Sequence, residues 1–497
     1  MEEHIKLPYE LNTWSGIVDI LSKNKCTNTN DFTKMIHDIN NLMNPPVLNN
    51  GLHDVIDNLN EYDIFISKII PYMKDIVLKM PILIPSSLPV LKKGSNGSLS
   101  LHRLQVLCLI CAGFLNCFND SKVYKKFNFS NLFSLLLQKL VKTKMLITYI
   151  IYMYDYYDNY LQGYVNEKDT ITYKRQSIKT KHINWKDDVN IISQVQITTT
   201  NRIDDIENGF QILTCNKNFG AYTLSDGYDA ESIRMCCNPE LLLTMLFCEN
   251  MSSNESIIVY GAQKYSSYSV IGSKVKYLDL ANEKAKTNVN IKKAKSRTSI
   301  SDDSSSSSSS DDEDIKTNTH KTKTKKQKVS LYYDSDDEDN EDNIKIVTKK
   351  SKCGSLIVDP LSNLGICLIN IKSNYNVKKC FQLKFLYKCL NKMLSGIISR
   401  GDIHTPIVSG EWGYNDRDGY PNVMILIQIC ACARAQRNLL LCFEETEDRF
   451  SINELQELIK LCISKQVTIS QLLLLIPEFP NRMDEYPSLY MFLISNL

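Results

Sequence analysis

The residues best suited to chemistry lie in residues 211–235, which read "QILTCNKNFGAYTLSDGYDAESIRM". The stretch "QIL" is typical of a strand, the following loop contains Gly220 and Gly227, and Glu231 stands where a helix is predicted to begin. Glycines let a backbone approach a ligand closely, and a carboxyl group can donate or accept a proton. The segment is therefore a candidate active-site loop with few side chains left for catalysis.

The composition predicts a chain with sizeable cores and no strong overall charge. The chain has 497 residues, of which 43% are hydrophobic, and this is enough for two or three domains. Its formal net charge of +2 gives no sign of nucleic-acid or membrane binding. The longest apolar run, at 104–118, is shorter than the roughly 20 residues that span a bilayer. With no apolar leader at its start, the chain is expected to be intracellular, nuclear or cytoplasmic, and not secreted.

The cysteines favour a packing role. The sequence contains 16 cysteines and seven histidines, without the spacing typical of zinc ligands. Cys108 and Cys111 form a CxxC, but it lies inside the apolar stretch "VLCLICAG", where both thiols would pack as small hydrophobic groups. We therefore expect reduced core cysteines, no metal site and no cofactor.

Two kinds of pattern follow each other along the chain. Residues 1–160 are predicted to be helical, since segments such as "SLHRLQVLCLICAGFLNCF" carry apolar residues at helical spacing. From about residue 171, short β-branched runs such as "FQILTCN" and "ESIIVYGA" predict strands. These runs alternate with predicted helices, among them "VMILIQICACARAQ" and "NPELLLTMLFCENM", the second capped by Asn238 with Pro239 at its first position. The alternation predicts an α/β layer architecture for 170–497.

Residues 281–350 differ in kind from the rest. They are polar and charged, with few aromatic residues, so they are expected to be disordered. The serines from Ser304 to Ser310 precede a run of acidic residues, a pattern that suits phosphorylation by acid-directed kinases. The lysines at 325–328 fit either a nuclear import signal or a solvated linker, and both readings stay open. Protein partners could bind through 283–350.

Several segments, in order and with matching spacing, resemble the poly(ADP-ribose) glycohydrolase family. They are "ITYKRQS", "ILTCNKNFGAYTLSDGYDAESIRMCCNPELLLTMLF", "YGAQKYSSYS", "SGEWGYNDRDGY" and "LIQICACARAQRNLLLCF". The resemblance implies an α/β (α+β) macrodomain-like core with a mostly α-helical N-terminal accessory domain. The helical domain would be 1–165, and the core would have two parts, 166–280 and 351–497, separated by the insert 281–350. Enzymes of this family hydrolyse the ribose–ribose O-glycosidic bonds of poly(ADP-ribose).

The family's acid/base position differs in this chain. The family signature ends in Gln-Glu-Glu, which falls here on Ala230, Glu231 and Ser232. The second glutamate is the family's acid/base residue, which protonates the leaving ribose oxygen and then activates water. Ser232 cannot do this near pH 7, and losing a positioned acid/base group typically costs about 10²–10⁴ in rate. Glu231 is therefore the remaining catalytic candidate, with help from Asp226 or Asp229 as an open alternative.

Other ligand-contacting positions also depart from the family pattern. Of the family's triple glycine only Gly220 remains, and an aspartate that precedes the kept Asn216 is replaced by Leu213. In the second glycine loop Asp416 and Asp418 would place negative charge where the ligand's phosphates are expected. The candidate ligand-binding positions implied by the resemblance are Asn216, Gly220, Ala221, Gly227, Trp412, Gly413, Tyr414 and Asn415.

Three functional hypotheses follow from the sequence. The first is a poly(ADP-ribose) glycohydrolase-like protein with reduced or lost catalysis, whose binding of poly(ADP-ribose) or ADP-ribose is weak or lost. The second is a divergent but active glycohydrolase that uses Glu231. The third is a non-enzymatic interaction scaffold with a phosphorylatable insert. None of them involves a membrane or sequence-specific contact with nucleic acid.

Overall fold

We describe the chain from a computed structural model. The described residues are 3–42, 62–118, 123–124, 129, 140–163, 169–192, 195–199, 202–206, 208–220, 223, 229–271, 274–278, 330–332, 345–347, 365–370, 377–398, 404–410, 420–443 and 452–497. Most of the predicted insert 281–350 lies outside these residues, so phosphorylation and nuclear import remain predictions. Its described parts, 330–332 and 345–347, pair as two antiparallel strands, so the prediction of disorder does not hold there.

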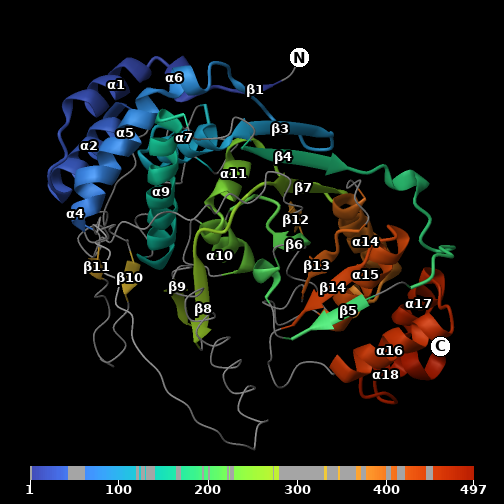
Figure 1. The fold of residues 1–497 in the computed structure, drawn as a ribbon. Helices are drawn as coiled ribbons and strands as arrows, with labels where there is room; N and C mark the ends of the chain where they lie inside the picture. Colours follow the sequence, from blue (N-terminus) through green and yellow to red (C-terminus); the bar gives the residue numbers. More distant parts are fainter. Residues whose placement is uncertain are drawn as a thin grey trace, which may run out of the picture.

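An eight-stranded mixed sheet runs through the middle of the molecule (Figure 1). Its strand order is β3-β4-β7-β12-β6-β13-β14-β5. The strands are β3 (Gly97–His102), β4 (Thr170–Ser177), β5 (Val195–Thr198), β6 (Phe210–Cys215), β7 (Glu255–Tyr260), β12 (Gly365–Asn370), β13 (Ile407–Ser409) and β14 (Leu439–Cys442). The five strands from β12 to β5 pair in parallel, so their carboxyl ends meet at one edge.

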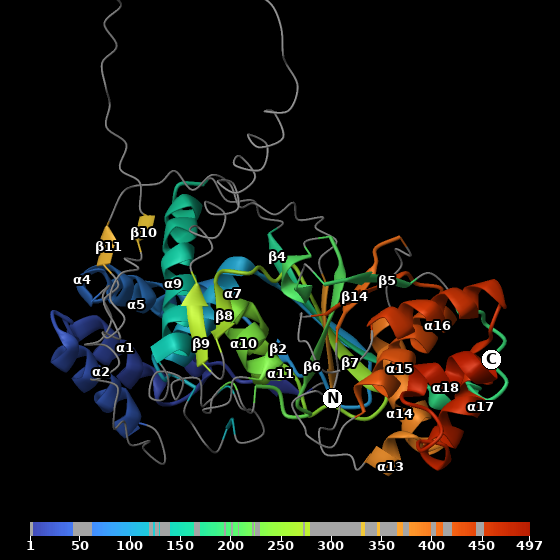
Figure 2. The same ribbon diagram turned by 90° about the horizontal axis from the view of Figure 1, so that it is seen from below.

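Helices cover both faces of this sheet (Figure 2). The N-terminal helices are α1 (Trp14–Lys23), α2 (Thr29–Leu42), α4 (Tyr62–Ile64), α5 (Ile70–Leu78), α6 (Met80–Leu83), α7 (Arg103–Phe114) and α9 (Leu140–Leu161). The later helices are α10 (Ala230–Cys237), α11 (Thr244–Phe247), α13 (Val377–Cys380), α14 (Leu383–Ile397), α15 (Pro421–Arg434), α16 (Ile452–Ser464), α17 (Ile469–Leu475) and α18 (Leu489–Asn496). Short two-stranded pairs join β1 (His4–Ile5) to β2 (Leu88–Pro89), β8 (Ser267–Ile271) to β9 (Lys274–Leu278), and β10 (Ser330–Tyr332) to β11 (Lys345–Val347).

Alternate residues of the central strands enter two different cores. In β12, Ile366 and Leu368 pack with the N-terminal helices, whereas Cys367 and Ile369 pack with α14 and α15. Successive side chains of a strand point to opposite faces, and a strand buried on both faces is therefore apolar throughout. The α/β core with a helical N-terminal part is confirmed.

The prediction of helix throughout residues 1–160 is wrong at β3. Residues 97–102, part of which was assigned to the helix of "SLHRLQVLCLICAGFLNCF", form an edge strand paired antiparallel with β4. Leu101 is buried while Ser100 is exposed, and this alternation suits a strand better than a helix. Helix α7 begins only at Arg103, and the first structural unit therefore contributes a strand to the main sheet.

The predicted packing role of the cysteines is confirmed for the described ones. All of these cysteines are free thiols, and each except the half-buried Cys26 is buried. Burial raises the pKa of Cys236 to about 12, as expected for a thiol in an apolar environment. Among the described residues, no helix combines the length and the apolar character needed to span a membrane.

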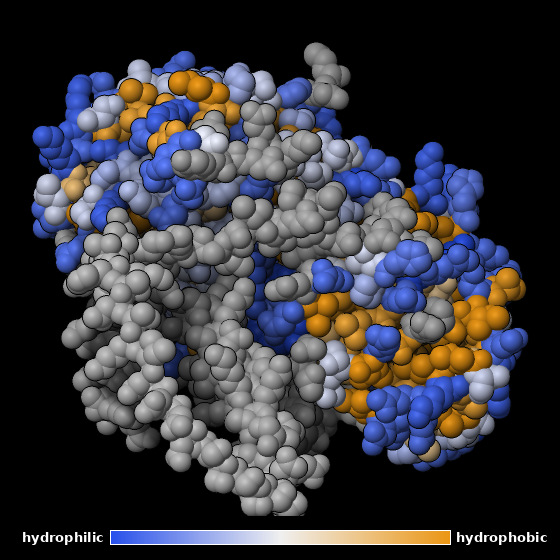
Figure 3. Space-filling model, in the orientation of Figure 1, coloured by the Kyte–Doolittle hydropathy of each residue, from blue (hydrophilic) through white to orange (hydrophobic). Residues whose placement is uncertain are grey.

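Hydrophobic side chains are also exposed on part of the surface. On the face shown in Figure 3 they gather at the lower right, the region of α16 to α18 in Figure 1. Exposed large hydrophobic residues of this segment are Ile463, Leu474 and Met483. Most hydrophobic residues of α16 and α18 nevertheless enter the second core, so these helices pack onto the sheet layer through their apolar faces.

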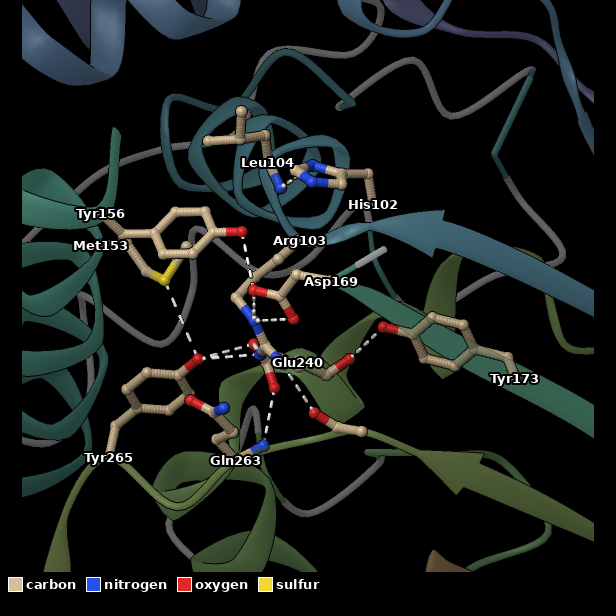
Figure 4. A network of polar contacts seen from close by, with 11 residues as sticks. His102, Arg103, Leu104, Met153, Tyr156, Asp169, Tyr173, Glu240, Gln263 and Tyr265 are labelled. Carbon is tan, nitrogen blue, oxygen red and sulfur yellow. Dashed lines mark hydrogen bonds and ion pairs between the residues drawn. The ribbon is translucent and has the colours of Figure 1, made fainter. Parts of the chain in front are cut away.

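A buried polar network joins the N-terminal helices to the sheet domain (Figure 4). Its centre is Arg103 at the start of α7, which is 3% exposed. The guanidinium pairs with Glu240, donates to the Asp169 carboxylate at 3.1 Å, and donates to the Gly261 carbonyl at 2.9 Å. The Tyr265 hydroxyl donates to the Glu240 carboxylate at 2.7 Å. Each of the three guanidinium nitrogens of Arg103 thus donates to at least one acceptor.

This network yields a prediction about stability. Replacing Arg103 with Met leaves the fully buried Glu240 carboxylate without its cation. We expect the free energy of unfolding to fall by about 3–5 kcal/mol, measured by urea denaturation of the full chain. The control is Lys23→Met, which removes an exposed pair with Asp19 and should change little. Equal midpoints for the two variants would contradict the role assigned to Arg103.

Candidate functional site

The candidate site begins where strand β6 ends, at the carboxyl edge of the parallel strands. Ligands of open α/β sheets commonly bind at this edge. The loop that follows runs from Asn216 to Gly220, whose φ of +66° lies in the left-handed region. A Cβ atom at Gly220 would also collide with the Met245 sulfur. Glycine is therefore required here both for backbone conformation and for space.

Helix α10 lies against the loop that follows β6 and forms the other side of the site. Asp229 is its N-cap, and the Oδ1 atom of this side chain accepts a hydrogen bond from the Ser232 amide at 2.8 Å. The predicted helix start near Glu231 is thus confirmed. Asp229 was considered as a replacement acid, but here one of its oxygens is used for capping. Asp226 lies outside the described residues.

The Glu231 carboxylate ties the loop to the helix. Its Oε2 atom accepts from the Asn216 amide at 2.8 Å, and its Oε1 atom accepts from the Gly220 amide at 2.9 Å. The side chain is only 2% exposed. Burial raises the pKa of Glu231 to about 8, outweighing the two backbone hydrogen bonds that lower it, and the charge of Asp229 adds to the rise. Burial thus favours the protonated form of Glu231 more than in a free glutamate, and both of its oxygens are used to hold the loop.

Ser232 occupies the next position and is fully buried. Its hydroxyl oxygen has no hydrogen-bond partner among the residues that the structure describes. A serine becomes reactive only beside a base that takes its proton. None of the described residues accepts the proton of the Ser232 hydroxyl, so none of these residues activates Ser232 as a nucleophile or as an acid.

The structure brings together only part of the predicted site. Asn216, Gly220 and Glu231 are in direct contact through hydrogen bonds, and Ser232 adjoins them in the first turn of α10. The predicted positions that lie outside the described residues are Ala221, Gly227, Trp412, Gly413, Tyr414 and Asn415.

Sequence reasoning missed a buried lysine beneath this loop. Lys392 of α14 is 3% exposed and donates to the Asn370 side-chain oxygen at 3.0 Å. The side-chain amide of Asn370 in turn donates to the backbone carbonyl of Cys215 at 3.1 Å, and Cys215 directly precedes Asn216. Burial lowers the pKa of Lys392 to about 8. A signal was present in the sequence, because Lys392 interrupts an otherwise apolar face between Cys389 and Met393.

A second missed group fixes the other end of α10. Asp204, which is largely buried, lies 2.8 Å from Lys264, 3.2 Å from Arg202 and 3.9 Å from Arg234 of α10. Burial acts to raise its pKa, but the three cations dominate and lower the pKa of Asp204 to about 2. Arg234 also donates to the Gln211 side chain of β6. Helix α10 is thus fixed against β6 by charge pairing as well as by Glu231.

The raised pKa of Glu231 predicts a pH-dependent stability. The unfolded chain ionises this group near its ordinary value of 4.5, while the folded chain keeps the proton up to about pH 8. The folded state therefore binds more protons between these values, and stability is lost as pH rises through this window. In this window the free energy of unfolding should fall by up to about 1.4 kcal/mol per pH unit. We expect Glu231→Gln to remove this pH dependence, measured by urea denaturation at pH 5, 6.5 and 8.

The matched control for this prediction is Glu457→Gln, which changes an exposed glutamate on α16. That variant should keep the slope of the unchanged protein. An unchanged slope in Glu231→Gln would mean that the carboxyl is ionised and solvated in the folded state.

Comparison with known proteins identifies the family. Residues 182–450, more than half of the chain, match the family model described as poly(ADP-ribose) glycohydrolase, macro domain fold, and residues 58–175 match its helical domain. Poly(ADP-ribose) glycohydrolase 2 of Caenorhabditis elegans is 22% identical over 312 residues, 62% of this chain and 52% of that protein. Probable poly(ADP-ribose) glycohydrolase 2 of Arabidopsis thaliana is 31% identical over 94 residues, 19% of this chain and 18% of that protein. The matches span about half or less of each relative's length. The chain belongs to the poly(ADP-ribose) glycohydrolase family.

Proposed function

We propose that this protein binds poly(ADP-ribose) through the fold of the family while its hydrolytic activity is lost or strongly reduced. The observation that carries the proposal is the state of the two side chains at the start of α10. Glu231 is buried with both oxygens accepting backbone hydrogen bonds, and Ser232 replaces the acid that the family resemblance implies. Under this proposal, neither group protonates a leaving ribose oxygen.

The chemistry of the reaction explains why this matters. Cleavage of a ribose–ribose bond needs an acid within about 2.6–3.2 Å of the leaving oxygen, followed by a base for water. Glu231 would have to give up its bonds to Asn216 and Gly220 to move toward a substrate. Those bonds hold the only described glycine of the loop in its left-handed conformation, so movement of Glu231 would disturb the binding loop itself.

The family features that remain support binding. The loop after β6 lies at the sheet edge where ligands commonly bind, and its backbone is held in a fixed shape before any ligand arrives. A preorganised loop costs less conformational entropy on binding. Because its relatives are named poly(ADP-ribose) glycohydrolase, we propose an ADP-ribose polymer as the ligand.

One observation favours an active enzyme as the second candidate. Burial raises the pKa of Glu231 to about 8, and this shift favours the protonated form that a general acid needs. Under this alternative, Glu231 leaves the Asn216 and Gly220 amides when substrate enters and donates its proton to the ribose oxygen.

The test measures polymer cleavage and polymer retention in the same samples. Labelled poly(ADP-ribose) is incubated with the unchanged protein, Glu231→Gln and the control Glu457→Gln, with an active glycohydrolase of the family as standard. We expect release of ADP-ribose at least about 10²-fold slower than the standard, since a positioned acid is missing. Glu231→Gln should not slow it further, and filter binding should show retained polymer.

The alternative gives a different pattern. Release that is rapid in the unchanged protein and in Glu457→Gln, but absent in a folded Glu231→Gln variant, would establish Glu231 as the acid. Absence of both release and retention would contradict each candidate.

A further inference from the structure

A cavity of about 360 Å³ opens beside helix α14. It is lined by Lys384, Tyr387, Lys388 and Asn391 of that helix and by Ser253 and Asn254, which precede β7. We call it the α14 pocket. Its volume lies at the lower end of the range of about 300–1,000 Å³ that is usual for small-ligand sites.

The α14 pocket lies at the same sheet edge as Glu231. Strand β7 is antiparallel to β12, so the residues before β7 lie where β12 ends. Strand β12 pairs in parallel with β6 up to Asn370 and Cys215, and the loop of Asn216 follows directly. Figure 1 shows β4, the other neighbour of β7, ending beside α14.

Helix α14 is also physically linked to the candidate site. Lys392, one turn beyond Lys388, donates to Asn370, and Asn370 donates to the Cys215 carbonyl. The helix that lines the pocket is therefore connected by hydrogen bonds to the residue that precedes the Glu231 loop. A ligand long enough to span the pocket and the loop would meet two connected sites.

Each side chain that lines the α14 pocket can donate a hydrogen bond, and two of them are lysines. Lys384 and Lys388 are exposed, lie one helical turn apart and form no ion pair with the residues that the structure describes. Asn391 accepts a hydrogen bond from the Trp185 indole at 2.8 Å through its Oδ1 atom, which leaves its NH₂ group to donate. Lysine ammonium and amide donors together are suited to phosphate oxygens.

The charges around the α14 pocket favour an anion. None of its lining residues is acidic, and Lys179 and Lys181 flank Thr180, which also lines it. One nearby carboxylate is Asp187; burial and, to a smaller extent, its charge raise the pKa of Tyr387. Asp187 itself accepts a hydrogen bond from Asn184 at 2.9 Å. Glu255, which follows Asn254, is fully buried and paired with Arg175. With Lys384 and Lys388, four lysines lie on or beside the lining, so the local potential is expected to be positive.

We infer that the α14 pocket binds a diphosphate of an ADP-ribose polymer while another unit of the same polymer occupies the loop held by Glu231. This inference rests on the proposed function, because it assigns the second contact of the same ligand. A polymer that engages both sites binds more tightly than a single unit, since the second contact is intramolecular. The pocket would thus select polymer over free ADP-ribose.

The experiment compares two pairs of lysines. Lys384→Gln/Lys388→Gln removes the charges of the α14 pocket, and Lys460→Gln/Lys465→Gln removes two exposed charges on and just after α16. Fluorescence anisotropy gives Kd for long poly(ADP-ribose) and for ADP-ribose at several salt concentrations. We expect the pocket variant to raise the polymer Kd roughly tenfold and to reduce the salt slope by about 1–2. Its Kd for ADP-ribose and both constants of the control should not change.

Three outcomes would overturn the inference. They are an unchanged polymer Kd in the pocket variant, an equal loss in the control pair, and an equal loss of affinity for single-stranded RNA of matched charge, which would indicate a general polyanion surface. Failure of the proposed function would give a different result. Rapid release of ADP-ribose that depends on Glu231 would refute the proposed function. The pocket variant could still raise the polymer Kd in that case, so the inference about the pocket would remain. An unchanged polymer Kd with polymer still retained refutes the pocket alone.

Discussion

The local structure of the site depends on one carboxyl group and the two backbone amides that it accepts from. Glu231 joins the start of α10 to the loop after β6 through bonds of 2.8 and 2.9 Å to Asn216 and Gly220. Backbone amides that face a buried region need acceptors, and a carboxyl held by two of them is itself largely satisfied. The same arrangement that shapes the loop therefore restricts the motion of the group best suited to chemistry.

The remainder of the molecule keeps this arrangement in place. The Arg103 network joins the N-terminal helices to the segment that follows α10, and the Asp204 cluster fixes α10 against β6 (Figure 4 shows the first). Lys392 supports the end of β6 from the opposite face through Asn370. Such buried contacts stabilise the fold independently of any reaction at the site.

Much of the fold was predictable from periodicity, and the site less so. The short, mostly apolar runs of β6 and β12 and the start of α10 near Glu231 follow from local sequence. Strand β3 was not predicted, because its alternating part, from Ser98 to Leu101, runs almost directly into a strongly apolar helix. The contacts of Glu231 were also out of reach, since its partners lie 15 and 11 residues upstream and their direction depends on Gly220. Lys392 stands alone on an apolar helical face, which indicates that its charge has a partner in the fold. The sequence does not say that this partner is Asn370.

The most direct test of this account is a crystal structure of the protein with ADP-ribose bound. The account predicts that Glu231 keeps both hydrogen bonds, to the Asn216 and Gly220 amides, and that no carboxyl group lies within about 3.2 Å of the ribose oxygen where cleavage would occur. A carboxyl at that oxygen, whether Glu231 released from the loop or another acid brought in, would contradict it.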